Sequence, residues 1–270
     1  MDKNIQLVVF DWAGTTTDFG SQAPVLAFDC TFSQLGLHFG REEINAPMGM
    51  EKKAHIQAML STESGTKLWT AVHGTMWIET DVERLYQSFE KTLAQVVAEH
   101  SHVIAGVPET VNQLRAQGIK IGSTTGYTAE IMQLVLPVAN VEGYAPDNVI
   151  TPDVPGIGRP APFMLYECMR QANVYPASRV VKVGDTVLDI LEGKNAGAWT
   201  IGILIGSNLM GLSQQEFEQV SNVKIEALKE SARISYQSAG ADLVIDSILD
   251  LPAAIDTINA RIVKREADSK

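Results

Sequence analysis

The chain has 270 residues, of which 45% are hydrophobic and 20% are charged, and its formal net charge is −11. This length suits an α/β unit that carries a smaller insert, and no stretch approaches the roughly 20 consecutive apolar residues of a membrane span. The negative charge opposes the phosphate contacts that hold proteins on nucleic acid, so we expect a small-molecule substrate, no nucleic acid and no membrane.

The first residues and the cysteines indicate a reduced, cytoplasmic protein. An apolar run of only four residues precedes Asp11, which is too short for the apolar region of a secretory signal. Cys30 and Cys168 lie in apolar or mixed helical segments. We therefore expect free thiols rather than a disulfide or a pair of metal ligands.

Short apolar runs bounded by turn residues predict the strands. They occur at residues 5–11, 119–125, 179–185, 199–206 and 242–246. Segments with helical spacing lie between the later runs, at 108–118, 129–139, 161–172 and 186–197. Short buried strands that alternate with helices are typical of a parallel sheet covered on both faces. We expect an α/β fold with a Rossmann-like parallel sheet as its core.

Residues 20–100 interrupt this alternation. Their apolar residues recur at spacings of three and four in the segments 23–36, 50–61 and 81–100, with no convincing strand. We therefore expect an all-helical insert at 20–100 and a catalytic core formed by 1–19 and 101–270. We expect the polar end, residues 263–270, to be frayed.

Polar residues follow the predicted strands at the edge where open α/β sheets bind ligands. The residues in question are Asp11, then Thr125 and Gly126, then Arg159 in a loop, and finally Asp185 with Asp189 beyond it. They offer a carboxylate that can attack, groups for an anion, a guanidinium, and carboxylates for a hard cation such as Mg²⁺. Each alone could be a turn residue, a helix cap or a solvated charge, but their joint order favours a phosphoryl-transfer site.

Four segments carry a resemblance to a known superfamily. "FDWAGTTTD", "GSTTGYT", "GRPAPFMLY" and "VKVGDTVLDILEGKNAG" resemble the motifs of the haloacid dehalogenase superfamily, and the helical insert lies where that superfamily has its cap domain. "FDWAGTT", "PMGMEKKAH" and "GSTTGYT" are similar, more closely, to the phosphonoacetaldehyde hydrolases, or phosphonatases. The resemblance implies hydrolysis of the carbon–phosphorus bond of phosphonoacetaldehyde, and it suggests a homodimer.

Ala13 distinguishes this chain from ordinary phosphatases of the superfamily, which place a general acid two residues after the nucleophile. A phosphonate has no leaving oxygen to protonate, so its cleavage needs an electron sink, which an amine supplies by forming an imine with the aldehyde. The phosphonatase pattern Pro-Met-Gly-x-x-Lys selects Lys52 over Lys53. On a helix, Lys52 and His55 would share a face, and Lys53 would point roughly 100° away.

The resemblance also implies a role for each site residue. Asp11 is the nucleophile that forms an aspartyl phosphate, and Lys52 forms a Schiff base with the aldehyde. The Mg²⁺ ligands are Asp11, the backbone carbonyl of Ala13 and Asp185, with Asp189 supporting them from behind. The phosphoryl oxygens are held by Thr125, Gly126 and Arg159. The aldehyde end is shaped, or its protons relayed, by Met48, His55 and Tyr127.

Three alternatives stay open at this point. A Mg²⁺-dependent phosphatase or mutase of the same superfamily would lack its usual acid at Ala13. A haloacid dehalogenase needs no metal, which disagrees with the acidic "GDTVLD". A non-catalytic phosphate or metabolite sensor would leave Asp11, Lys52 and Asp185 unexplained.

Overall fold

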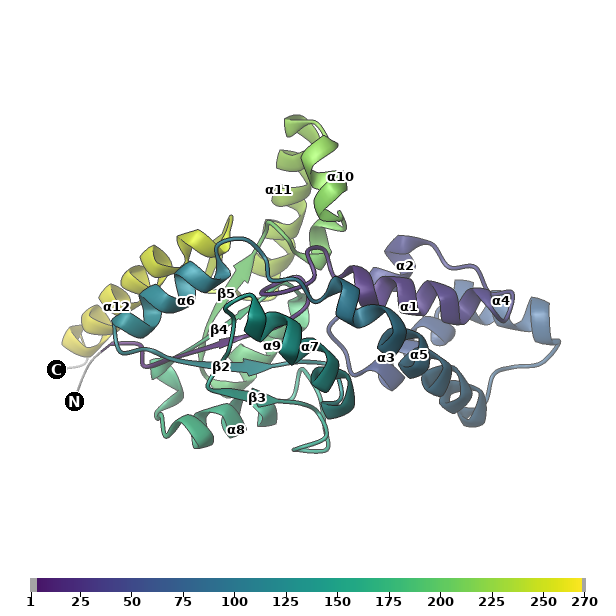
Figure 1. Cartoon of the computed structure of the whole chain (residues 1–270), viewed down its shortest axis with the longest axis horizontal. Helices are drawn as coiled ribbons and strands as arrows, with labels where there is room; N and C mark the ends of the chain where they lie inside the picture. The colour runs from purple at the N-terminus through teal and green to yellow at the C-terminus, as the bar shows by residue number, and fades with distance from the viewer. Residues whose placement is uncertain (1–3, 269–270) are drawn as a thin grey trace.

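The computed structural model describes residues 4–268, and it shows an α/β core with a helical unit at one side (Figure 1). Six parallel strands form one sheet in the order β3-β2-β1-β4-β5-β6. The strands are β1 (Leu7–Phe10), β2 (Lys120–Thr124), β3 (Asn148–Ile150), β4 (Val180–Gly184), β5 (Trp199–Ile203) and β6 (Leu243–Ile245). The expected α/β fold with a Rossmann-like parallel sheet is confirmed. Strand β3 was not predicted.

Helices cover both faces of the sheet. The core helices are α6 (Val107–Ala116), α7 (Ala129–Val141), α8 (Phe163–Ala172), α9 (Val187–Ala196) and α12 (Leu251–Asp268). On one face α6, α7 and α12 pack against Val8, Phe10 and Val181, while α8 packs against Leu7 and Val9 on the other. Because successive strand residues point to opposite faces, the continuous apolar run of β1 is buried on both sides.

Five helices lie between β1 and α6 in the chain and form the cap. They are α1 (Gln22–Ser33), α2 (Arg41–Asn45), α3 (Lys52–Ser61), α4 (Glu63–His73) and α5 (Glu79–His100). Helices α1 and α5 pack together, with the rings of Phe28 and Phe89 stacked 4.2 Å apart. Helices α2 and α4 fall between the segments predicted from periodicity. The division of the chain at residues 20 and 100 stays a prediction, and α1 and α5 begin and end close to those positions.

The two linkers between core and cap run side by side. The Asp18 N–H donates to the His102 carbonyl at 3.1 Å, and the Ile104 N–H donates to the Thr16 carbonyl at 2.9 Å. Backbone hydrogen bonds at two points join the linkers into a short ribbon. A motion of the cap relative to the core would have to be absorbed beside this ribbon.

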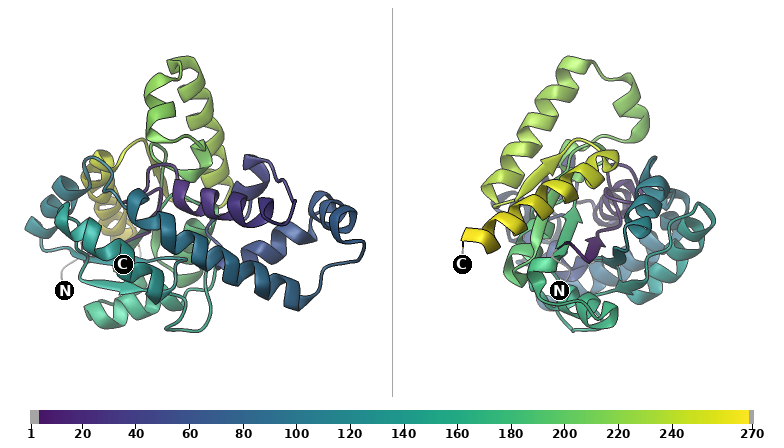
Figure 2. Two further views of the ribbon diagram at one scale, coloured as in Figure 1. Left: turned by 45° about the vertical axis from the view of Figure 1, so that its right-hand side comes forward. Right: turned by 90° about the vertical axis from the view of Figure 1, so that its left-hand side faces the viewer.

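A helical hairpin of α10 (Gln214–Gln219) and α11 (Asn222–Ser238) projects from the core after β5 (Figure 2). It was not predicted. Near its base, Arg41 of the cap lies 3.4 Å from the Glu216 carboxylate, and the Asn208 side-chain amide donates to the Asn45 side chain at 3.1 Å. The core therefore meets the cap on this side as well as through the linkers.

The C-terminal expectation was wrong over most of its length. Helix α12 continues to Asp268, while residues 269 and 270 lie outside the described part of the chain. One side of this helix is buried and carries Ile255, Ile258 and Ile262. In its last turns, the Arg265 Cζ atom lies 4.5 Å from the ring centroid of Trp199. These contacts hold the last turns that composition alone assigned to a frayed end.

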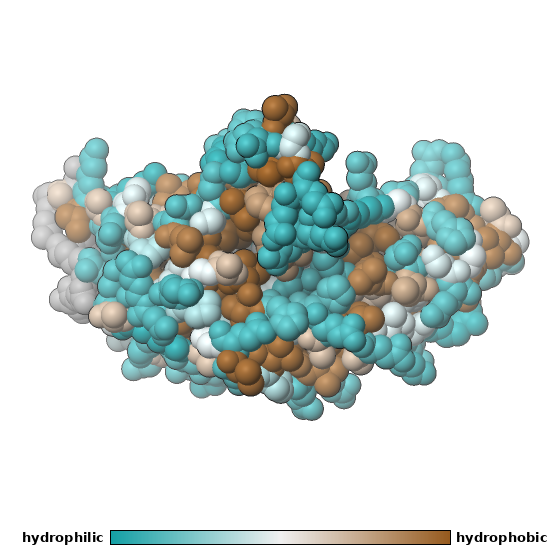
Figure 3. Space-filling model, turned by 45° about the horizontal axis from the view of Figure 1, so that its top comes forward, coloured by the Kyte–Doolittle hydropathy of each residue, from teal (hydrophilic) through white to brown (hydrophobic). Residues whose placement is uncertain are grey.

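Hydrophilic and hydrophobic residues are mixed in small groups on the face shown in Figure 3. None of the helices within residues 4–268 combines the length and apolar character that crossing a bilayer requires. Both cysteines are free thiols, as expected, with Cys30 exposed and Cys168 buried.

Candidate active site

The candidate site lies beside β1, where the order in which successive strands join the sheet reverses. Strand β1 pairs with β2 on one side and with β4 on the other, so the connections from these strands diverge and leave a crevice at their carboxyl ends. Asp11 follows β1, and its N–H donates to the Val183 carbonyl at 3.0 Å. Asp185 follows β4. The two residues therefore face each other across neighbouring strand ends.

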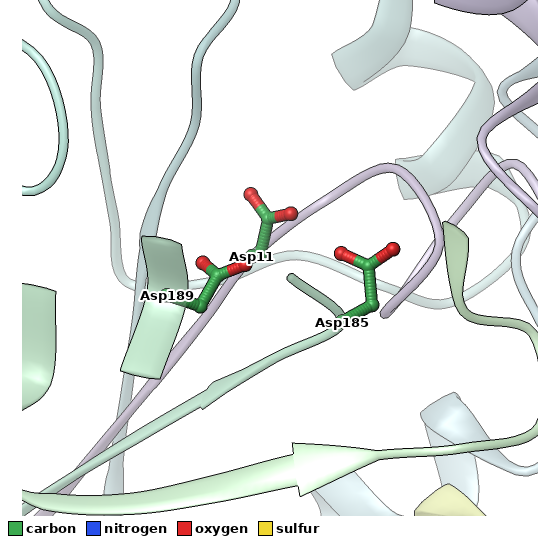
Figure 4. A group of neighbouring side chains, drawn as sticks. All are labelled: Asp11, Asp185 and Asp189. Carbon is green, nitrogen blue, oxygen red and sulfur yellow. The ribbon is translucent and has the colours of Figure 1, made fainter. Parts of the chain in front are cut away.

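Three carboxylates meet at this crevice (Figure 4). One side-chain oxygen from each of Asp11, Asp185 and Asp189 lies within 4.8 Å of the others, and all three residues are buried. Burial raises the pKa of Asp11, although Arg159 opposes this change. Burial, together with the charges of Asp11 and Asp189, raises the pKa of Asp185 well above its ordinary value. The site thus concentrates negative charge away from water.

Asp189 differs from the other two because two cations, Arg159 and Lys182, lie against its carboxylate. Its carboxylate accepts from the Thr186 hydroxyl at 2.6 Å, and it lies 3.0 Å from both Arg159 and Lys182. Burial alone would raise the pKa of Asp189, but these two cations lower it. This position suits a residue that supports the site from behind.

The donor set fits a divalent cation. Asp11 and Asp185 are two buried carboxylates, and burial raises the pKa of each. Carboxylate and carbonyl oxygens are the ligands that Mg²⁺ prefers. Ala13 lines the same cavity, and Gly14 has φ +79°, where an added Cβ would lie 2.1 Å from an Asp185 oxygen. The loop after β1 thus comes close to Asp185 only because residue 14 has no side chain.

Arg159 links several of these groups, and its side chain is buried. One terminal nitrogen donates to Asp11 Oδ1 at 2.7 Å and to the Thr124 carbonyl at 2.7 Å, and the other lies 3.0 Å from Asp189. Its Nε donates to Glu192 at 3.1 Å. The structure therefore places the predicted guanidinium directly beside the predicted nucleophile.

Lys182, Glu192 and Ser21 also belong to this site, and they were missed from the sequence. Lys182 is fully buried on β4, with Nζ 3.0 Å from Glu192 and 2.6 Å from the Thr124 hydroxyl. Ser21 lines the cavity, and its hydroxyl donates to Asp185 at 3.4 Å. A signal for Lys182 existed, because a lysine inside the apolar run "RVVKVGD" needs a buried partner.

Lys52 is the first residue of α3 and is only 5% exposed. Its Nζ lies 3.9 Å from the Met48 sulfur, and 5.8 and 5.7 Å from the ring centroids of Phe28 and Tyr127. Burial lowers the pKa of Lys52 to about 8, with Asp11 opposing the change and Arg159 adding to it. An amine with this pKa is partly neutral near pH 7.

Lys53 occupies a different environment. Its Nζ lies 3.0 Å from Glu79 and 3.0 Å from Glu83 on α5, and its side chain is 36% exposed. The Glu51 carboxylate accepts from the backbone N–H groups of Lys53 and Ala54, at 3.0 Å each, and so caps α3. This cap sets the first turn so that Lys52 faces the core and Lys53 faces solvent.

The remaining predicted residues divide into two groups. Thr125, Gly126, Tyr127 and Met48 line the cavity. His55 does not: its ring stacks on Phe28 with 3.9 Å between centroids. Burial and the charge of Lys52 lower the pKa of His55 well below its ordinary value.

Two cavities meet at the boundary between core and cap. The inner cavity has a volume of about 30 Å³ and lies among Asp11, Asp185, Arg159 and Lys52. The outer cavity has a volume of about 730 Å³ and shares Lys52 and Arg159 with the inner one. The inner volume would hold about two water molecules. Residues of the cap and of the core therefore lie close together around it.

Comparison with known proteins places this geometry among hydrolases. Residues 5–197 match the family model described as haloacid dehalogenase-like hydrolase. The phosphonoacetaldehyde hydrolase of Bacillus cytotoxicus is 42% identical over 94% of this chain and 96% of its own. The phosphonoacetaldehyde hydrolase of Parabacteroides distasonis is 44% identical over 96% of this chain and 98% of its own. The crystal structure of a phosphonoacetaldehyde hydrolase-like protein from Oleispira antarctica is similar, with a TM-score of 0.94 and 36% identity over 96% of this chain and 94% of that one.

Proposed function

Since the chain belongs to the phosphonoacetaldehyde hydrolase family of haloacid dehalogenase-like hydrolases, we propose that it converts phosphonoacetaldehyde and water to acetaldehyde and phosphate through a Lys52 Schiff base and an Asp11 aspartyl phosphate. One observation carries the mechanism. A buried amine whose pKa is lowered to about 8 lines the same cavity as Asp11, while Ala13 removes the acid of ordinary phosphatases.

The first step is formation of an imine. The neutral Nζ of Lys52 adds to the aldehyde carbon, and loss of one water gives the imine, whose protonated form withdraws electrons from the neighbouring carbon. Met48 and the rings of Phe28 and Tyr127 surround this amine and keep water from it. His55 supports the Phe28 ring from behind, so we assign it to shaping this pocket.

In the second step a carboxylate oxygen of Asp11 attacks phosphorus. The carbon–phosphorus bond breaks, and its electron pair moves into the iminium to form an enamine on Lys52. Arg159, the Thr125 hydroxyl and the Gly126 backbone hold the phosphoryl oxygens at the cavity wall. Asp11, the Ala13 carbonyl and Asp185 form the proposed Mg²⁺ site. A bound Mg²⁺ would neutralise part of the phosphoryl charge.

Two hydrolytic steps complete the reaction. Water attacks the aspartyl phosphate and releases phosphate from Asp11. The enamine carbon takes up a proton, and a second water hydrolyses the resulting imine to free acetaldehyde and Lys52. We expect substrate to enter and products to leave when the cap moves away from the core, because the inner cavity is lined by residues of both.

Borohydride trapping tests the proposal. With phosphonoacetaldehyde present, mass spectrometry should find a reduced adduct on Lys52, and Lys52→Arg should lose both adduct and turnover, while the matched control Lys53→Arg keeps both. An adduct on Lys53 alone would overturn the assignment of the amine. Phosphate release without any adduct would indicate a phosphatase, and the absence of turnover would indicate a sensor.

We also propose that the protein is a homodimer, as the resemblance to phosphonatases suggests. Light scattering coupled to size-exclusion chromatography should give twice the mass of the 29.3 kDa chain. A mass of one chain across the micromolar range would contradict this.

A further inference from the structure

Behind Arg159 lies a buried group of charged and polar side chains that the proposed chemistry does not use. It consists of Lys182 on β4, Glu192 on α9 and the Thr124 hydroxyl at the end of β2. One oxygen of Glu192 accepts from Arg159 Nε at 3.1 Å and from Thr124 Oγ1 at 3.0 Å, and it lies 3.0 Å from Lys182 Nζ. Both Lys182 and Glu192 have 0% exposure. Three donors therefore converge on one buried acceptor.

Stability alone is a poor explanation for these charges. Burying two ions costs hydration free energy that their mutual attraction barely offsets. Apolar residues of similar volume often stabilise a core equally well. The contacts instead have a directional effect on Arg159. Its guanidinium is planar, so an acceptor on Nε fixes the plane in which the two terminal nitrogens point. Those nitrogens point towards Asp11 and Asp189.

Arg159 also lies at the boundary between the two cavities. It precedes α8 in a loop and lines both the inner cavity and the 730 Å³ outer cavity. A long side chain at such a boundary has many conformations, and only some of them reach the phosphoryl site. The hydrogen bond to Glu192 holds the Nε atom of Arg159 on the core side of this boundary.

We propose that Glu192 is a positioning residue that orients Arg159 towards the phosphoryl group, and that Lys182 and Thr124 hold the Glu192 carboxylate in place. The inference rests on the proposed function, because it assumes that the inner cavity receives a phosphoryl group. It assigns no contact with the substrate to Glu192 itself.

Binding of inorganic phosphate in the presence of Mg²⁺, measured by calorimetry, tests this role. Glu192→Leu should weaken phosphate binding about tenfold and raise KM by a similar factor, since it frees Arg159 from a charge-assisted hydrogen bond. Glu192→Gln, which keeps an acceptor oxygen, should retain most of the affinity. Unchanged phosphate binding in Glu192→Leu would overturn the inference, and undetectable binding by the unaltered protein would overturn the phosphoryl site together with it.

A double-variant cycle separates positioning from a general loss of stability. In an Arg159→Lys background, where no Nε remains, Glu192→Leu should change phosphate affinity less than twofold. A tenfold loss in that background as well would show that Glu192 does not act through Arg159. If Glu192→Leu does not fold, the double variant Glu192→Leu/Lys182→Met replaces it in these measurements, because it removes both buried charges together.

Two controls complete the design. Thr110→Val removes a buried hydroxyl that donates to the Ile248 carbonyl, and neither residue lines the two cavities, so the change should lower stability without changing phosphate affinity. Borohydride trapping of acetaldehyde on Lys52 should proceed normally in Glu192→Leu, because no phosphoryl group takes part. Failure of trapping in the unaltered protein would instead count against the proposed function, while the phosphate measurements would still decide the role of Glu192.

Discussion

Replacing Lys52 with methionine should abolish turnover and yet stabilise the protein at pH 7. Burial lowers the pKa of Lys52 from 10.5 to about 8, so the folded state disfavours the charged amine relative to the unfolded chain. Each pKa unit corresponds to about 1.4 kcal/mol, which makes the charging penalty about 3 kcal/mol for this almost fully buried amine. Methionine has a similar length and carries no charge, so it escapes the penalty.

The sign of the pH dependence follows from the lowered pKa. Below about pH 8 the amine of Lys52 is charged in both states, and the full penalty weakens the unaltered protein. Between about pH 8 and 10.5 the unfolded chain binds more protons than the folded one, so the stability of the unaltered protein rises with pH. The advantage of Lys52→Met should therefore shrink to less than half by about pH 9.5.

Urea unfolding followed by tryptophan fluorescence at pH 7 and pH 9.5 measures this difference. Lys53→Met is the matched control, because the Lys53 amine is partly exposed and pairs with Glu79 and Glu83. Its removal should not stabilise the protein at either pH. A Lys52→Met protein that is less stable than the unaltered one at pH 7, or an advantage that is equal at both pH values, would refute the reasoning.

Further predictions concern the nucleophile, the metal and the two backbone features that shape the site. Asp11→Ala should release no phosphate while borohydride still traps an adduct on Lys52; phosphate release at the normal rate would exclude Asp11 as nucleophile. EDTA treatment should stop turnover and added Mg²⁺ should restore it, and a full rate in EDTA would remove the metal from the mechanism. Gly14→Ala should lower kcat by about 100-fold or more, because the new Cβ would lie 2.1 Å from an Asp185 oxygen and displace that carboxylate; normal kinetics would show that the loop can move at no cost. Glu51→Ala should lower the free energy of unfolding by about 1 kcal/mol through loss of the α3 cap, and should also lower kcat. Loss of stability with unchanged kcat would mean that the cap does not position Lys52.

Local patterns predicted much of this molecule. The apolar runs that end at Asp11 and Asp185 could be recognised as strands because buried strands are short and continuously apolar. The helical spacing of 129–139, 161–172 and 186–197 matches α7, α8 and α9. Because parallel strands end at one edge, residues that follow them come together without further information. The site residues that follow strands could therefore be named from the sequence, whereas Lys182 inside β4 and Glu192 inside α9 were missed.

Other features depend on contacts between segments far apart in the chain. Strand β3 has three residues and forms a strand because β2 offers it a partner edge. Whether 263–268 frays or packs depends on Trp199 and on the sheet beneath α12. Periodicity within one segment contains none of this information.

The sequence by itself determined the α/β alternation, the helical insert and the strand-end carboxylates, because each follows from residue types at short spacing, while the choice of Lys52 came from the resemblance to the phosphonatase pattern. Only the tertiary structure decided that Lys52 is buried enough for its pKa to fall to about 8, that His55 lies behind Phe28 rather than in the cavity, and that Lys182 and Glu192 meet behind Arg159. The reason is physical. Burial and charge pairing depend on which distant segments exclude water from a side chain, and that is a property of the packed core and cap together.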